Sequence, residues 1–179
     1  MSQDLSDVGA ERAVLAGLFR HGVDVYVDVS DIIDHRTFSH HNNQVLYRCV
    51  ESAIQANREI DLPSILSAAS QLNFSELVNS KQELTYIKSL FDFPVKKENV
   101  LDFAVQIKKF EFARNIKKLT MKIHKDMDSV NGTESIDEII GRIEDPVMDF
   151  LREDDGGERP EKIGKDVDEY LEFITENKC

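Results

Sequence analysis

The chain has 179 residues, with 22 basic and 34 acidic side chains and a formal net charge of -12. This length fits one ordinary domain, or one domain with an appended arm, and argues against an enzyme built on two full cores. A chain this acidic is not expected to grip a phosphate backbone directly. No apolar run approaches the roughly 18 residues that cross a membrane, and the N-terminus has no secretion signal. With only Cys49 and Cys179, no disulfide framework is possible, so we predict a cytoplasmic location.

The charge is unevenly distributed along the chain. Residues 129–179 carry a net charge of -10, whereas residues 100–128 carry +3. These central basic residues could contact nucleic acid. Because they are interleaved with apolar residues, we interpret them as one solvated helix face.

Apolar residues recur every three to four positions, and this spacing predicts an all-α fold. Ser6 or Asp7 is the candidate N-cap of the first helix, and Gly22 is its stop. Residues 23–29, VDVYVDV, alternate as in a strand but also fit one helical face. We predict a short helix there, because the sequence offers no second strand for pairing.

Ser39 and Asp61 are candidate N-caps for the next two helices. Cys49 lies on the apolar stripe of the first of these helices, so its thiol is predicted to be buried in the core. Pro63 is compatible with the first turn of the second. Short helical segments around residues 74–78 and 84–91 lead to a loop at Phe93-Pro94.

A single helix of roughly 30 residues is predicted from about Asn99. Asn131-Gly132 turns the chain, and Ser135 with Glu138 forms a capping box for a return helix. Together they predict an antiparallel helical hairpin that protrudes from the head. Pro146 is expected to kink the return helix, unless Asp145 caps a new one.

A two-helix hairpin cannot bury both apolar stripes against itself, so part of that surface is expected to meet another subunit or protein. The predicted hairpin interface comprises Ile116, Leu119, Ile123, Met127, Ile136, Ile139, Ile140 and Ile143.

A charged segment with two glycines and a proline follows, at residues 152–162, and predicts a flexible linker. Beyond it, residues 163–179 contain one amphipathic helix without a core of its own, so its apolar face is expected to dock elsewhere. The predicted organisation is a compact head at 1–98, a hairpin at 99–151, this linker and a C-terminal linker helix. The predicted docking residues of that helix are Ile163, Val167, Tyr170, Leu171 and Ile174.

The residue patterns predict no metal site. An acidic cluster begins at Asp126, but a calcium loop counted from there has Val130 where an oxygen ligand belongs and Asn131 where the glycine belongs. Neighbouring histidines at 35, 40 and 41 lie in one loop region and lack a closed ligand set, so we interpret them as solvated loop residues.

No catalytic or nucleotide site is predicted in this chain either. Gly164-Lys165 resembles part of a phosphate loop. However, Gly156 and Gly157 lie eight and seven residues before Gly164 instead of five, and Asp166 replaces the Ser or Thr that would hold magnesium. No nucleophile elbow, zinc-protease motif or Cys-x-x-Cys pair is present.

Five segments in order resemble the N-terminal domain of DnaB-type replicative DNA helicases. Residue 16 is Ala where the family pattern has its first glycine, and Thr37, Ser39 and Asn43 replace the usual Asp, Tyr and His. The segments are AERAVLAGLF at 10–19, FSHHNNQVLYRCVESAI at 38–54, IDLPSI at 60–65, TYIKSL at 85–90, and Asn99 followed by Phe103-Ala104 and EFARN at 111–115.

The resemblance implies an N-terminal collar domain of a hexameric helicase, whose hairpins pair between subunits and whose collar docks primase or a helicase loader. It also implies that a RecA-type ATPase domain would follow the linker helix in the parent protein. ATP, magnesium and most contact with single-stranded DNA are expected in that domain. An alternative interpretation is a stand-alone adaptor or regulator that binds a replicative helicase or primase.

Overall fold

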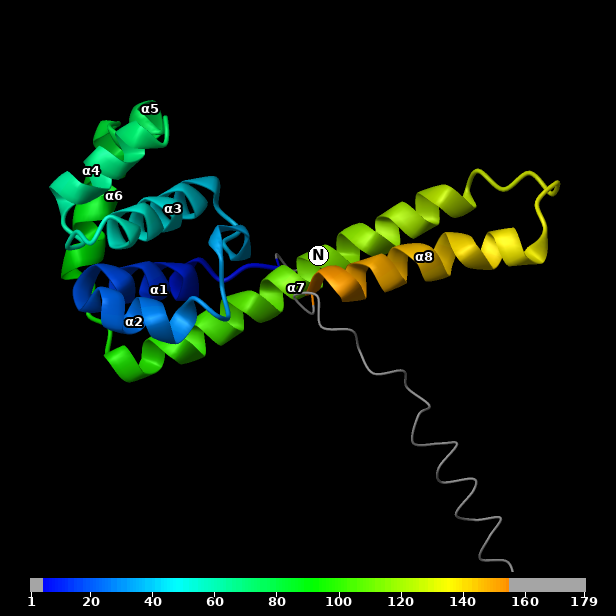
Figure 1. Ribbon diagram of the computed structural model, residues 1–179, viewed down its shortest axis with the longest axis horizontal. Coiled ribbons are helices and arrows are strands. Elements are labelled where there is room, and N and C mark those ends of the chain that lie inside the picture. The colour runs from blue at the N-terminus through cyan, green and yellow to red at the C-terminus, as the bar shows by residue number, and fades with distance from the viewer. Residues whose placement is uncertain (1–4, 155–179) are drawn as a thin grey trace, which may run out of the picture. The chain divides into compact units, whose positions relative to one another are not determined.

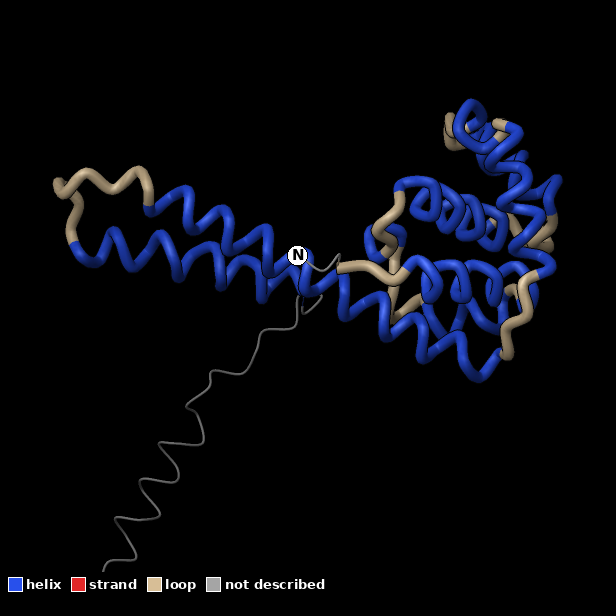
Figure 2. The backbone as a smooth tube through the Cα atoms, turned by 180° about the vertical axis from the view of Figure 1, so that it is seen from behind, coloured by secondary structure: helices blue, strands red, loops and turns tan. Residues whose placement is uncertain are grey.

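The computed structural model describes residues 5–154, and within them all regular structure is helical (Figures 1 and 2). The all-α prediction is confirmed. The chain divides into two compact units, Met1–Asn115 and Ile116–Cys179. We call residues 5–115 the head and residues 116–154 the hairpin.

Eight α-helices and one 3-10 turn follow one another over the described residues. They are α1 (Val8–His21), α2 (Val23–Val29), η1 (His35–Thr37), α3 (His41–Gln55), α4 (Leu62–Gln71), α5 (Ser75–Val78), α6 (Lys81–Asp92), α7 (Lys97–Met127) and α8 (Ile136–Asp154). None of these helices is both long and apolar enough to cross a membrane.

Helix α1 is the centre of the head. Asp7 caps it by accepting a hydrogen bond from the Ala10 amide at 2.9 Å. Of the two candidate caps, Ser6 and Asp7, the structure therefore selects Asp7. The helix contacts α2, α3 and α6, and nearly every side chain from Ala10 to Phe19 is buried. A helix covered on so many sides must be apolar around most of its circumference, as this one is.

The alternating valines form helix α2, as predicted. Val25 and Val29 are buried, whereas Val23 and Val27 are exposed on the other face. A strand at this position would leave backbone groups unpaired, because the described residues contain no other strand. Pairing, and not side-chain alternation, therefore decides the conformation.

The predicted N-cap of α3 is wrong. His40 occupies the cap position without a side-chain cap bond. Ser39 instead donates its amide and its hydroxyl to the Glu11 carboxylate of α1, at 2.6 and 2.5 Å. The Ser39 hydroxyl is therefore bound to a buried carboxylate of a distant helix, and it does not accept a hydrogen bond from the first turn of α3 as an N-cap would.

The long helix is confirmed, but its first half belongs to the head and not to the hairpin. Val100, Ala104 and Ile107 of α7 are buried in the same core as α1. The boundary between the units falls at Asn115, not at residue 98 as predicted, because this apolar face packs on the head before the helix continues.

The hairpin consists of α7 from Ile116 onward, a turn, and α8 running antiparallel to it (Figure 2). Helix α8 continues through Pro146, so Asp145 does not begin a new helix. It also extends to Asp154, and the first three residues of the predicted linker are therefore helical. The predicted linker-helix residues at 163–174 lie outside the described residues.

Candidate protein-interaction surface

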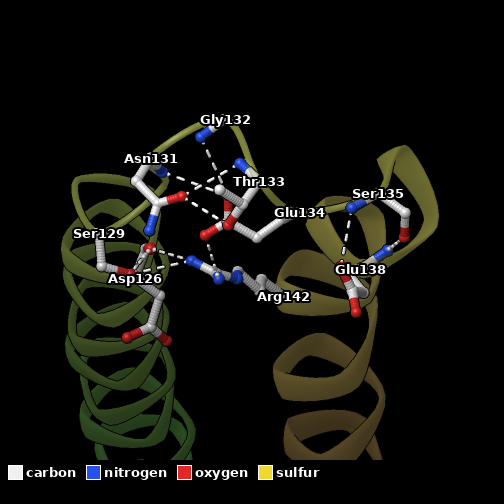
Figure 3. Close-up of polar contacts among 9 residues, drawn as sticks. All are labelled: Asp126, Ser129, Asn131, Gly132, Thr133, Glu134, Ser135, Glu138 and Arg142. Carbon is white, nitrogen blue, oxygen red and sulfur yellow. Dashed lines mark hydrogen bonds and ion pairs between the residues drawn. The ribbon is translucent and has the colours of Figure 1, made fainter.

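The tip of the hairpin is a hydrogen-bonded turn centred on Glu134 (Figure 3). Its carboxylate accepts hydrogen bonds from the amides of Asn131 and Gly132, at 3.2 and 3.1 Å. Arg142 of α8 pairs with the same carboxylate at 3.1 Å and also donates to the Asp126 carbonyl at 3.0 Å. These contacts connect the end of α7 to the start of α8.

Glu134 is held in its ionised form by these donors. Its own backbone amide, the amides of Asn131 and Gly132 and the charge of Arg142 lower the pKa of the carboxyl below its usual value. Gly132 has a φ of 88°, a conformation that favours glycine. The predicted turn at Asn131-Gly132 is thus fixed by the Glu134 side chain of the turn itself and by Arg142 of α8.

The predicted capping box is confirmed at the start of α8. The Ser135 hydroxyl accepts from the Glu138 amide at 3.2 Å, and the Glu138 carboxylate accepts from the Ser135 amide at 2.8 Å (Figure 3). The box therefore satisfies two amide donors at the start of α8 that the helix itself cannot satisfy. Among the described residues, no group of three or more His, Cys, Asp or Glu side chains is placed to hold a metal ion.

The two helices of the hairpin meet along a half-buried seam. None of the described side chains from residue 116 to residue 152 is fully buried. The seam residues are Leu119, Ile123 and Met127 on α7, and Ile139, Pro146, Val147 and Phe150 on α8.

A second row of apolar side chains on α8 is exposed to solvent. Ile136 is 77% exposed, and Ile140, Ile143 and Leu151 are 41–44% exposed. Their spacing of four, three and eight residues places them on one stripe of the helix beside the seam. We call these four residues the α8 edge. Such a row can bind apolar surface from another molecule.

The predicted hairpin interface is therefore divided between the seam and the surface. Leu119, Ile123, Met127 and Ile139 are half-buried in the seam, whereas Ile116, Ile136, Ile140 and Ile143 are exposed. Leu151 and the exposed Met121 and Met148 were missed. The stripe on α8 could have been extended to Leu151 from its position eight residues after Ile143. Contact between copies through these residues stays a prediction.

The head contains a buried polar network that sequence reasoning also missed. Glu11 is 1% exposed, and besides Ser39 it accepts a hydrogen bond from the Asn43 side chain at 2.8 Å. Tyr86 donates to Asn43 at 3.0 Å, and burial raises the pKa of Tyr86 to about 12. The available signal in the sequence was the charged pair Glu11-Arg12 within the mostly apolar segment of α1. The network connects α1, α3 and α6 by hydrogen bonds, so we interpret its role as structural.

Two further features of the head are a buried cysteine and an open hollow. Cys49 is buried, as predicted, and burial raises its pKa to about 11, so the thiolate is disfavoured. A hollow of about 760 Å³ lies beside α1 and is lined partly by Ala13, Phe93, Val95 and Phe103. Besides this apolar surface, its lining includes the charged residues Asp7, Arg20 and Lys96.

Residues 3–109 match the family model described as the DnaB-like helicase N-terminal domain. The chain belongs to this family. No curated protein matches the sequence.

A solved structure provides an independent comparison for this DnaB-like domain. The crystal structure of the N-terminal domain of DnaB helicase from Mycobacterium tuberculosis superposes with a TM-score of 0.69 at 16% identity. The match covers 82% of this chain and 99% of that one. At this identity the likeness shows the fold, and the resemblance found in the sequence is confirmed.

Proposed function

We propose that this DnaB-like domain assembles helicase subunits into a collar through its hairpin, and that the collar docks primase or a helicase loader during DNA replication. In the parent protein, ATP and magnesium would act in a separate RecA-type motor domain, which would also hold most of the single-stranded DNA. The residues of this chain would then contribute assembly and recruitment, not chemistry.

The observation that carries the proposal is the α8 edge. Burying one exposed Ile or Leu side chain fully is worth about 1.5–3 kcal/mol. The edge residues are already partly covered, and association also costs translational and rotational freedom, so the gain is smaller. Contact through this edge would be weak for isolated copies, and tethering to a ring of motor domains would multiply it.

The test compares two aspartate substitutions in the complete chain. Ile140→Asp places a charge in the middle of the α8 edge, whereas Val27→Asp places one on the exposed face of α2, where Val27 is 62% exposed. Light scattering over a concentration series should show self-association of the native chain and of Val27→Asp, and a monomer for Ile140→Asp. Equal association of all three would refute assembly through this edge.

Recruitment is tested separately with purified primase and loader from the same source. Binding is measured by titration against the native chain and the Ile140→Asp variant. We expect at least one of the two proteins to bind the native chain. If neither binds, the recruitment half of the proposal fails while the assembly half stands on its own result.

A further inference from the structure

The two helices of the hairpin carry opposite charge. The part of α7 from Ile116 to Met127 has four lysines and one carboxylate, a net charge of +3. Over residues 136–152, α8 has five carboxylates and two arginines, a net charge of -3. The lysines are Lys117, Lys118, Lys122 and Lys125, and the carboxylates of α8 are Asp137, Glu138, Glu144, Asp145 and Asp149; all nine are exposed.

These charges do not neutralise one another within the chain. Among the side chains described for the hairpin, no ion pair joins α7 to α8. Arg152 pairs with Asp149 of its own helix at 3.4 Å, and Arg142 pairs with Glu134 of the turn. The four lysines have no carboxylate partner in the described part of the chain. The hairpin part of α7 therefore presents a net positive charge to solvent, and α8 presents a net negative charge.

A second copy of this chain is the partner that such a surface fits. In a two-fold interface, each contact between a residue of one copy and a residue of the other occurs twice, with the roles exchanged. A hairpin with one basic and one acidic helix is self-complementary when unlike helices meet. If like helices met, lysine would face lysine and carboxylate would face carboxylate, which is unfavourable.

We propose that the hairpins of two copies associate with α7 of one copy beside α8 of the other, and that charge selects this arrangement. The inference rests on the proposed self-association and adds which helix meets which. The α8 edge supplies apolar contact area in either arrangement. Charges around an apolar contact select the partner and the orientation, as they do at the flanks of coiled coils.

A nucleic acid is a less suitable partner for the lysines. Every phosphate that approaches α7 also approaches a hairpin whose other helix is acidic, in a chain with a net charge of -12. The segment from Lys117 to Lys125 spans only about 12 Å at 1.5 Å per residue, and it contains no Phe, Tyr or Trp side chain on which bases could stack. A second copy offers both signs on one surface.

The experiment uses two charge-reversal variants of the full chain. The basic set is Lys117→Glu, Lys118→Glu and Lys122→Glu, and the acidic set is Glu144→Lys, Asp145→Lys and Asp149→Lys. Lys125 and Glu138 are left intact, because they lie in the last turn of α7 and in the capping box of α8. The control reverses Lys81, Lys88 and Lys96, which are exposed on the head. Circular dichroism checks that all variants keep native helix content.

Sedimentation of a labelled copy titrated with an unlabelled copy measures association. Each reversal set alone should weaken self-association by about tenfold or more, because several exposed pairs become repulsive. A one-to-one mixture of the two sets should associate about as tightly as the native chain. The control should behave like the native chain, and native association should weaken as salt rises.

Three outcomes would overturn this inference. The first is that the native chain associates and both reversal sets associate as tightly as it does. The apolar edge would then be sufficient for the proposed assembly, and the charge pairing would be refuted. If each set is weakened but the mixture is not restored, unlike helices do not meet. If association is unchanged and only the basic set loses binding to a 30-residue thymidine oligonucleotide, the lysines form a nucleic-acid surface. A native chain that stays monomeric would instead refute the proposed assembly itself.

Discussion

The head and the hairpin are built from the same kind of amphipathic helices, but they bury them differently. Leu15, Leu18 and Val14 of α1 are 0% exposed, whereas no described hairpin side chain is fully buried. The head completes its core with its own helices, because α2, α3 and α6 pack against α1 and further helices pack against these. Two helices can cover only one side of each other. The head therefore buries its apolar surface within itself, whereas the hairpin leaves apolar surface exposed.

The largest expected effect is in the core of the head. Leu15→Ala should lower the free energy of unfolding by about 2–5 kcal/mol, because it leaves a cavity around a fully buried side chain. Urea denaturation followed by circular dichroism measures it. Leu101→Ala, at a residue that is 41% exposed, is the matched control and should cost less than about 1 kcal/mol. Similar losses for both would show that the head is loosely packed.

The buried network should rank next. Glu11→Ala removes the acceptor of the Ser39 amide, the Ser39 hydroxyl and the Asn43 side chain. Leaving these donors without an acceptor should cost about 1–3 kcal/mol. Asp102→Ala, at an exposed residue of α7, should stay within about 0.5 kcal/mol of the native chain. Denaturation curves that coincide for Glu11→Ala and Asp102→Ala would contradict a structural role for the network.

One substitution made in both regions should change stability in opposite directions. A Cβ on Gly17 would lie 2.5 Å from Cγ2 of Val100, so Gly17→Ala should destabilise the head by about 1–3 kcal/mol. A Cβ on Gly141 of α8 would meet only Asp145, at 3.8 Å. Gly141→Ala should therefore stabilise the hairpin by about 0.5–1 kcal/mol through helix propensity.

Amide hydrogen exchange separates the two effects by region, because it reports α1 and α8 individually. Slower exchange in α8 of Gly141→Ala and faster exchange in α1 of Gly17→Ala are expected. The same sign of change in both regions would mean that the hairpin is packed as tightly as the head.

The smallest effect concerns the hairpin tip and its dependence on pH. Because the pKa of Glu134 is lowered in the folded chain, its stabilising contribution is present above the unfolded value near 4.5. It is lost as the pH falls through the lower folded value. Amide chemical shifts of Asn131 and Gly132 should titrate with a midpoint below 4.5. The titration should be missing in Glu134→Gln, and a midpoint at or above 4.5 would contradict the contacts at the tip.

The sequence could predict which residues form the apolar stripes of the hairpin, but not which of them are exposed. The period of the apolar residues indicated both stripes of the hairpin, because that period follows from helix geometry alone. It could not separate Ile139, which is half-buried in the seam, from Ile140, which is 43% exposed. The division depends on the rotation of each helix against the other. The lysines of α7 were predicted to lie on a solvated helix face, and they are exposed. Only the structure showed that, in the part of the chain it describes, they form no ion pair with α8.

The sequence by itself determined the features that depend on neighbours within a few residues. Asp7 and Asp61 cap their helices, and Ser135 with Glu138 starts α8, because a cap needs only the first turn that follows it. The five ordered segments also identified the family that the model match and the fold confirm.

Only the tertiary structure decided the features that depend on distant partners. Ser39 binds Glu11, 28 residues away, and does not cap α3. The first half of α7 joins the head because Val100 packs against Gly17. Contacts between residues this far apart in the sequence depend on how whole helices pack. The spacing of apolar residues over a few helical turns does not determine that packing.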